Sequence, residues 1–331
     1  MTALRTPART SAAGGGAPLA AAGVALLALV LGLLLAGGAP APAPVGLPDA
    51  GPVVGWAVPV LRLVQHVAAV ATVGALLVGL LAGRDATVGR GEVAMVALPA
   101  TTWALAALGS LVVGLAEITG RPLSTVLDPD LIRSYVEQVA TGRALLWTAL
   151  LAASVALAAS AAYLMTGRAA LLVLALSALV PTLRTGHAAT ASDHTLSVTA
   201  TSVHVVAVVL WVGGLAALVA TARRPSLPVV LPRFSALALL CFLAVVGSGA
   251  VSSWTRLQEP EQLWGTGYGG LLLAKTAAVG LLGAAGWLHR RRSLAGVAAG
   301  SPGAFTRLAV AEVALMAVAL GLAVALSRSP L

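Results

Sequence analysis

The sequence of 331 residues has few of the charged side chains that keep a protein dissolved in water. Only 9% of its residues are charged and 59% are hydrophobic, and the mean hydropathy is +0.97. These values lie far outside the range of soluble domains. Because each membrane crossing takes ~20 apolar residues, the composition predicts an all-α, polytopic transmembrane bundle of about nine helices.

Cysteine is also nearly absent, since Cys241 is the only one and lies in an apolar run. Disulfides within one chain, CxxC redox chemistry and thiolate zinc sites are therefore excluded. The sequence has no GxxxxGK[ST] phosphate-binding loop, no HExxH motif and no GxSxG motif. The sequence therefore gives no support for an ATP-driven pump or a membrane hydrolase, and we expect no enzymatic activity.

What the sequence does contain is a series of apolar runs separated by Gly, Pro and Arg. Nine such runs cover residues of about 19–37, 53–83, 93–118, 141–166, 169–185, 197–221, 231–254, 268–289 and 304–327. The fifth run contains Pro181, which we expect to break or kink its helix.

The formal net charge of +9 comes mostly from arginines in the connectors between these runs. With the N-terminus inside, twelve arginines fall in inner segments and six in outer segments. The positive-inside rule therefore predicts a multi-pass protein of the cytoplasmic membrane with a cytoplasmic N-terminus and an external C-terminus. The lipid bilayer is the expected partner of its surface, and nucleic acid is not a partner.

The chain divides into three predicted parts. Residues 1–52 form an N-terminal anchor helix and a Pro/Ala-rich outer loop, residues 53–196 a helix bundle with an outer histidine loop, and residues 197–331 a four-helix membrane domain. Arg5 and Arg9 ahead of the first run are also compatible with a cleaved secretory signal. The apolar core of this run, about eighteen residues, favours a retained anchor.

Histidine is rare but is concentrated toward one side of the predicted membrane. His66, His187, His194 and His204 fall in the outer half, whereas His289 lies at an inner boundary beside three arginines. One connector carries His187, Asp193 and His194, and His204 follows ten residues later. Imidazole is a good ligand for copper, zinc, iron and nickel, so this pattern predicts a transition-metal entry site. The alternative is a polar outer loop with incidental histidines.

Other ionisable groups lie within the runs, where they should face the interior of the bundle. Arg62 comes one turn before His66, on the same helix face. Lys275 lies in the outer part of the eighth run, and Glu312 shares a helix face with Met316 in the ninth. An imidazole in hydrocarbon needs a hydrogen-bond partner or a bound metal, and His66 and His204 are placed deep enough to need one.

From residue 197 to residue 327 the sequence resembles the copper resistance protein D (CopD) family. The resemblance rests on Trp254 and on four segments: His204 with Trp211-Val-Gly213-Gly214-Leu215, Phe234-Ser-Ala-Leu-Ala238, Gly247-Ser-Gly249, and Tyr268-Gly-Gly-Leu-Leu-Leu-Ala-Lys275. The preceding half, with Arg62-Leu-Val-Gln-His66 and Gly186-His187, looks like the N-terminal part of longer CopD proteins. In some actinobacteria such a region precedes a cytochrome c oxidase assembly domain, and this chain resembles the CopD portion alone.

The resemblance implies a membrane protein of copper uptake or tolerance, with His204 and Lys275 at family motif positions and His187 as a ligand near the mouth. We therefore predict copper transport, with a copper ion bound by His187, His194, His204 and His66. The supporting residues are Lys275, Asp193, Trp211, Arg62, Glu312 and Met316.

Two alternatives to copper transport remain open. One is a b-type haem protein that uses His66 and His204 as axial ligands. The other is a non-transporting factor that delivers copper to a periplasmic copper chaperone or an oxidase assembly factor.

Overall fold

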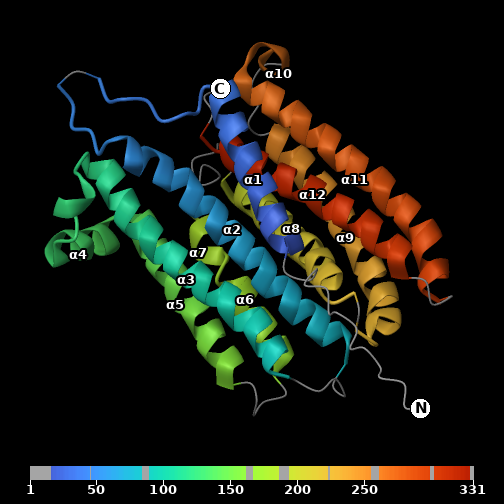
Figure 1. Ribbon diagram of the computed structural model, residues 1–331. Coiled ribbons are helices and arrows are strands. Elements are labelled where there is room, and N and C mark those ends of the chain that lie inside the picture. Colours follow the sequence, from blue (N-terminus) through green and yellow to red (C-terminus); the bar gives the residue numbers. More distant parts are fainter. Residues whose placement is uncertain are drawn as a thin grey trace, which may run out of the picture.

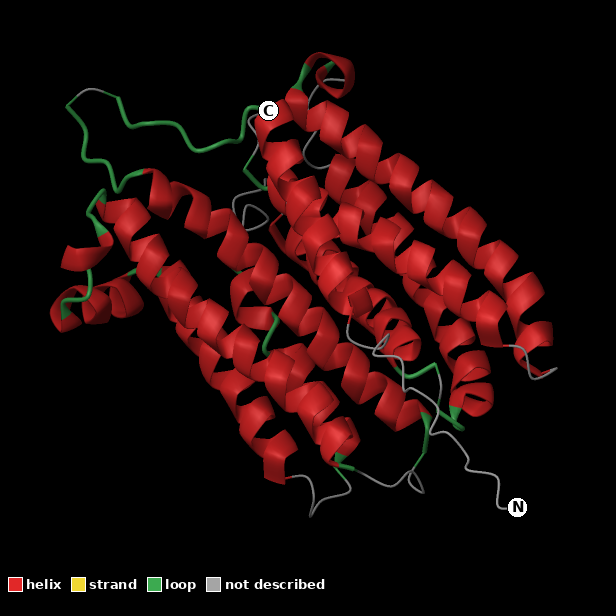
Figure 2. Ribbon diagram, in the orientation of Figure 1, coloured by secondary structure: helices red, strands yellow, loops and turns green. Residues whose placement is uncertain are grey.

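The computed structural model describes residues 16–44, 46–83, 89–161, 167–185, 194–222, 224–254, 261–298 and 302–328. Its regular elements are helices throughout these ranges (Figure 2). They are α1 (Gly16–Leu35), α2 (Pro52–Leu81), α3 (Arg90–Thr119), the 3-10 helix η1 (Leu123–Thr125), α4 (Pro129–Gln138), α5 (Ala140–Ala161), α6 (Arg168–Ser177), α7 (Val180–Leu183), α8 (His194–Ala220), α9 (Leu227–Trp254), α10 (Gln262–Gly265), α11 (Gly267–Ala298) and α12 (Pro302–Leu326).

Among the described residues, seven helices are long and apolar enough to cross a bilayer. They comprise Pro52–Leu81, Arg90–Thr119, Ala140–Ala159, Val198–Ala220, Leu227–Trp254, Gly267–Leu288 and Thr306–Leu326. The predicted all-α membrane bundle is confirmed. In the first and fifth apolar runs the described residues hold shorter apolar helical stretches, Ala20–Leu35 and Arg168–Leu183.

The fifth run is interrupted just before Pro181, as its sequence predicts. Helix α6 ends at Ser177 and α7 begins at Val180, which places Pro181 in the first turn of α7. The break frees backbone carbonyl groups that need hydrogen bonds. The buried Thr148 hydroxyl on α5 donates to the Ala178 carbonyl oxygen at 3.1 Å, so a neighbouring helix satisfies one of them.

The helices pack as two neighbouring groups (Figure 1). One group contains α2, α3, α5 and α6, and the other contains α8, α9, α11 and α12. Helix α1 comes first in the chain but packs along α12, the last helix. Ala25, Leu29 and Leu33 of α1 are almost fully buried there, together with Val324 and Ala325. The N-terminal helix therefore completes the core of the C-terminal group.

Two glycines bring the groups together where α2 meets α8. A Cβ atom added to Gly74 would collide with the carbonyl oxygen of Gly213, and one added to Gly213 would collide with the carbonyl oxygen of Val70. The two backbones are thus in direct contact, which only glycine allows at these positions.

A charged cluster at one end of the bundle also joins the two groups. Glu92, in the first turn of α3, accepts hydrogen bonds from Arg168 of α6 at 3.2 Å and from Arg224 of the α8–α9 connection. Arg168 also donates to the Gly79 carbonyl oxygen at 2.6 Å, and Arg233 of α9 donates to the Leu81 carbonyl oxygen at 2.7 Å. We call Glu92, Arg168 and Arg224 the Glu92 cluster. Together with Arg233 it satisfies carbonyls that the C-terminal end of α2 leaves open.

Candidate functional site

A polar contact inside the bundle joins His204 of α8 to α9. Its Nδ1 atom lies 3.1 Å from the Ser248 hydroxyl oxygen. Gly249 follows Ser248, and a Cβ added there would lie 3.7 Å from Cε1 and 3.9 Å from Nδ1 of the same ring. The edge of the imidazole that carries Nδ1 and Cε1 therefore faces α9, and the absence of a side chain at Gly249 lets the ring approach closely.

The hydrogen bonds around Ser248 decide which imidazole nitrogen carries the proton. A serine hydroxyl has one hydrogen, and Ser248 donates it to the Ala244 carbonyl oxygen one turn earlier in α9. The Ser248 oxygen can then only accept from His204, so Nδ1 carries the proton. In the neutral imidazole, Nε2 is left with the lone pair that binds a metal.

The predicted supporting residues Lys275 and Trp211 lie near this contact. Lys275 of α11 is close enough to His204 for its charge to act on the imidazole. Trp211, two turns beyond His204 on α8, packs edge to face against Phe242 of α9, with ring centroids 5.6 Å apart and planes at 82°. Three helices thus converge on His204, and the aromatic pair holds α8 against α9.

His66 and Arg62 lie on one face of α2, one turn apart, and both side chains are exposed. Arg62 donates through Nη1 to the Ser327 hydroxyl oxygen just beyond α12, at 3.0 Å. Arg328 pairs with Glu117 of α3 at 2.8 Å, and the charges of both residues act on Arg62. We call Arg62, Glu117, Ser327 and Arg328 the Arg62 cluster. It lies at the opposite end of α3 from the Glu92 cluster.

The Glu117 carboxylate also links this cluster to α4, outside the membrane-spanning helices. Burial, followed by the negative charge of Glu117, raises the pKa of the Tyr135 phenol on α4. Tyr135 is 3% exposed and belongs to the same apolar cluster as Val54 at the start of α2. The ends of α2, α3, α4 and α12 are therefore tied together around the Arg62 cluster.

The two membrane histidines lie at similar depth on neighbouring helices. Both α2 and α8 run from the Arg62 cluster side toward the Glu92 cluster side. Counted from the Gly74–Gly213 contact at a rise of ~1.5 Å per residue, His66 is about 12 Å away and His204 about 14 Å away, toward the same end. This arrangement agrees with the predicted position of both residues in one half of the membrane.

The predicted histidine mouth is only partly within the described chain. His187 and Asp193 lie outside the described residues, and His194 begins α8 without a described side chain. In the described part, no three His, Cys, Asp or Glu side chains are grouped so that they could hold a metal ion. The four-histidine copper site therefore stays a prediction.

Glu312 and Met316 lie one turn apart on α12, and both face the interior of the bundle. Glu312 is 6% exposed and Met316 is 2% exposed. The burial agrees with the expectation that intramembrane ionisable groups face inward. Their proposed supporting role stays a prediction.

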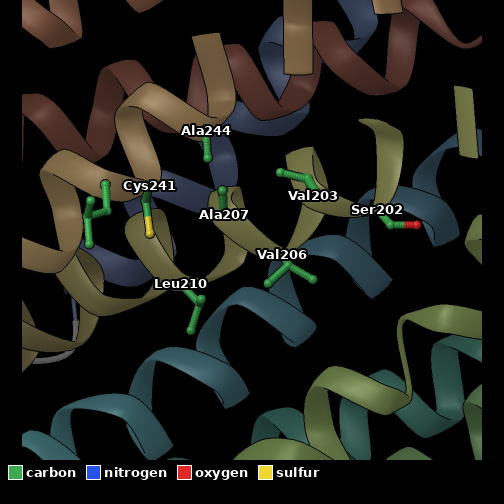
Figure 3. Close-up of a pocket in the computed structure, with 8 residues that line it drawn as sticks. Ser202, Val203, Val206, Ala207, Leu210, Cys241 and Ala244 are labelled. Carbon is green, nitrogen blue, oxygen red and sulfur yellow. The ribbon is translucent and has the colours of Figure 1, made fainter. Parts of the chain in front are cut away.

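A hollow of about 410 Å³ lies between α8 and α9 (Figure 3). Its walls include Val203, Val206 and Leu210 from α8 and Cys241 and Ala244 from α9, all of them apolar or weakly polar. The Ser202 hydroxyl at its edge donates to the Val198 carbonyl oxygen. This hollow therefore offers no ligand set for a metal ion.

Sequence reasoning missed two polar elements of the site. Ser248 enters the sequence analysis only within the segment Gly247-Ser-Gly249, although a serine between glycines inside an apolar run is itself a signal of a polar contact. The Arg62 cluster joins Arg62 to residues 117, 327 and 328, which are far apart in sequence. No local pattern connects them.

Comparison with known protein families gave two matches. Residues 228–326 match the family model described as copper resistance protein D, and residues 48–196 match the one described as copper resistance protein D-like, N-terminal domain. No curated protein and no solved structure matches the chain. The first match includes α11 with Lys275, and the second includes α2 with His66. Residues 197–227, which hold most of α8 with His204 and Gly213, lie between the two matches. The chain is a multi-span membrane protein of the CopD copper resistance family, with a CopD-like N-terminal domain.

Proposed function

We propose that this protein moves copper across the cytoplasmic membrane and that His204 is the ligand at the centre of its path. The contact between His204 and Ser248 carries the proposal, because it holds an imidazole inside the bundle with Nε2 available for a metal. Copper is the cargo of this site. Family membership supports copper handling, whereas the path and its ligands belong to the proposal.

The ligands of the path are mainly imidazoles. His187, His194 and Asp193 form its entrance, His204 lies in the membrane, and His66 lies at similar depth on α2. Imidazole binds copper well, and the chain holds only four methionines and one cysteine for a softer thioether or thiolate path. Lys275, Trp211, Glu312, Met316 and Arg62 have supporting roles.

The proposed orientation places the Glu92 cluster in the cytoplasm and the Arg62 cluster outside, with the N-terminus cytoplasmic. The arginine distribution supports this orientation. The proposed domains are residues 1–52, 53–196 and 197–331, with the first helix packed on the third domain.

A b-type haem protein is the second candidate, favoured by the similar depth of His66 and His204 on neighbouring helices. Axial haem ligation needs two imidazoles on opposite sides of the iron, and a similar depth on neighbouring helices is one requirement for that. A factor that hands copper to a periplasmic chaperone or an oxidase assembly factor would use the same entrance without moving copper across the membrane.

Metal analysis and an optical spectrum of the purified protein separate these functions. We expect bound copper and no Soret band, whereas a strong Soret band would establish the haem alternative. Cellular copper content should fall with His204→Ala at matched expression. The matched control is Ser253→Ala on α9, whose hydroxyl donates only to the Gly249 carbonyl within its own helix. Equal copper content for His204→Ala and wild type would refute the transport path.

A further inference from the structure

The Arg62 cluster contains more positive than negative charge. Arg62 and Arg328 contribute two guanidinium groups, and Glu117 contributes the single carboxylate that accompanies them. That carboxylate is engaged by Arg328 at 2.8 Å. The guanidinium group of Arg62 is attracted by the charge of Glu117 at longer range and repelled by the charge of Arg328.

Most hydrogen-bond donors of Arg62 are unused within the described chain. A guanidinium group has five N–H donors, and in the described residues Arg62 uses one of them, toward the Ser327 oxygen. Ser327 donates its own hydrogen to the Val324 carbonyl, so it serves Arg62 only as an acceptor. The remaining donors form a planar fork that matches the oxygens of a carboxylate or phosphate.

His66 lies one turn below this fork on the same exposed face of α2. Side chains at this spacing are separated by ~6 Å on a helix surface. A bare copper ion on His66 would therefore sit beside the positive charge of Arg62. An imidazole ligand next to a guanidinium group with unused donors in the described chain suits a copper complex that brings its own carboxylates.

We propose that the Arg62 cluster is an oxyanion site that accepts the carboxylates of a copper chelate, while His66 takes an open coordination position on the same copper. The proposal rests on the copper function proposed above and adds the chemical class of the cargo. Binding exchanges one water ligand of copper for an imidazole nitrogen, and the oxidation state does not change. The carboxylates stay on copper and accept hydrogen bonds from Arg62.

Two tridentate copper(II) complexes with the same donor spacing test this inference. Iminodiacetate supplies two carboxylates, so its copper(II) complex is neutral. Diethylenetriamine supplies only neutral amines, so its copper(II) complex keeps a charge of +2. Their affinities are measured by equilibrium dialysis against the full-length protein in phosphatidylcholine nanodiscs. We expect wild type to bind the iminodiacetate complex about tenfold more tightly, as a charge-assisted hydrogen bond implies.

The variants separate the oxyanion site from general electrostatics. Arg62→Gln should remove the preference, and Arg62→Lys should keep part of it because it retains the charge without the fork. The control Arg133→Gln removes another external arginine, which is exposed and paired with Glu137, and should keep the full preference. Equal binding of the two complexes by wild type, or a preference that survives Arg62→Gln, would overturn the proposal.

A lipid phosphate is the other source of an oxyanion at this depth. Native mass spectrometry in discs that contain phosphatidylglycerol shows whether wild type, and not Arg62→Gln, retains that lipid. Retention without any preference between the chelates would assign the site to lipid and overturn the chelate as its ligand. If His66→Ala and His204→Ala also leave copper binding unchanged, the proposed function itself fails. If these two variants abolish copper binding while Arg62→Gln leaves the preference between the chelates unchanged, only the oxyanion site fails.

Discussion

Ser248 on α9 holds the Nδ1 side of His204 on α8 at 3.1 Å and directs the free Nε2 lone pair away from the serine. Loss of the hydroxyl removes the group that orients the ring. Residues that orient a ligand in this way typically change metal affinity by ~10- to 100-fold. We expect Ser248→Ala to fold normally and to weaken copper binding about tenfold, as measured by competition with a copper chelator.

The conservative variant Ser248→Thr keeps a hydroxyl and should recover most of the affinity. If Ser248→Ala binds copper as tightly as wild type does, the serine does not position the ligand.

The contact between Gly74 and Gly213 should be the position least tolerant of added volume in the membrane. Gly213→Ala places a methyl group against the Val70 carbonyl oxygen, so α2 and α8 must separate. We expect the thermal midpoint of the detergent-solubilised protein to fall by several degrees, which corresponds to a cost of ~1–3 kcal/mol for overpacking. The measurement is a thermal shift assay.

Gly280→Ala on α11 is the matched control, since nothing lies within 4 Å of a Cβ added there. It should be neutral or slightly stabilising because alanine favours helix more than glycine does. A larger loss for Gly280→Ala than for Gly213→Ala would contradict the packing of α2 against α8.

The Glu92 cluster should be sensitive to removal of its single negative charge. Glu92→Gln leaves Arg168 and Arg224 close together without a carboxylate, although partial exposure of all three side chains moderates the effect. We expect a loss of about 1–2 kcal/mol in the free energy of unfolding, measured as a lower thermal midpoint. Glu137→Gln, which breaks an exposed pair with Arg133 on α4, should change the midpoint little. Similar losses in both variants would show that Glu92 does not join the two helix groups.

The orientation in the membrane can be read with single cysteines in a Cys241→Ser background. Ser124 in η1 and Pro225 in the α8–α9 connection are both exposed. They lie at opposite ends of the bundle, because η1 follows the end of α3 whereas Arg224, next to Pro225, pairs with Glu92 at the start of α3. With a cytoplasmic N-terminus, an impermeant thiol reagent should label Ser124→Cys in sealed cells and Pro225→Cys only after lysis. The reverse pattern would invert the orientation predicted from arginine.

The sequence alone was enough to predict where the long apolar helices lie, but not the short helices η1, α4 and α10 between them. Seven of the predicted apolar runs became long apolar helices, because the hydrocarbon core demands a continuous apolar stretch whatever its neighbours are. The break before Pro181 followed from the missing backbone donor and the ring of proline, which are also local properties. The CopD segments were recognisable because they are contiguous in the chain.

The partners of the polar side chains were decided only by the tertiary structure. The Ser248 hydroxyl meets His204 across 44 positions, and Arg62 meets Ser327 across 265. The packing of α1 on α12 likewise joins the two ends of the chain. Hydropathy determines that a segment enters the membrane, but all the apolar helix faces are nearly equivalent toward lipid. Close backbone contacts at glycine and the need to pair each polar group select the neighbours, and both depend on the whole bundle.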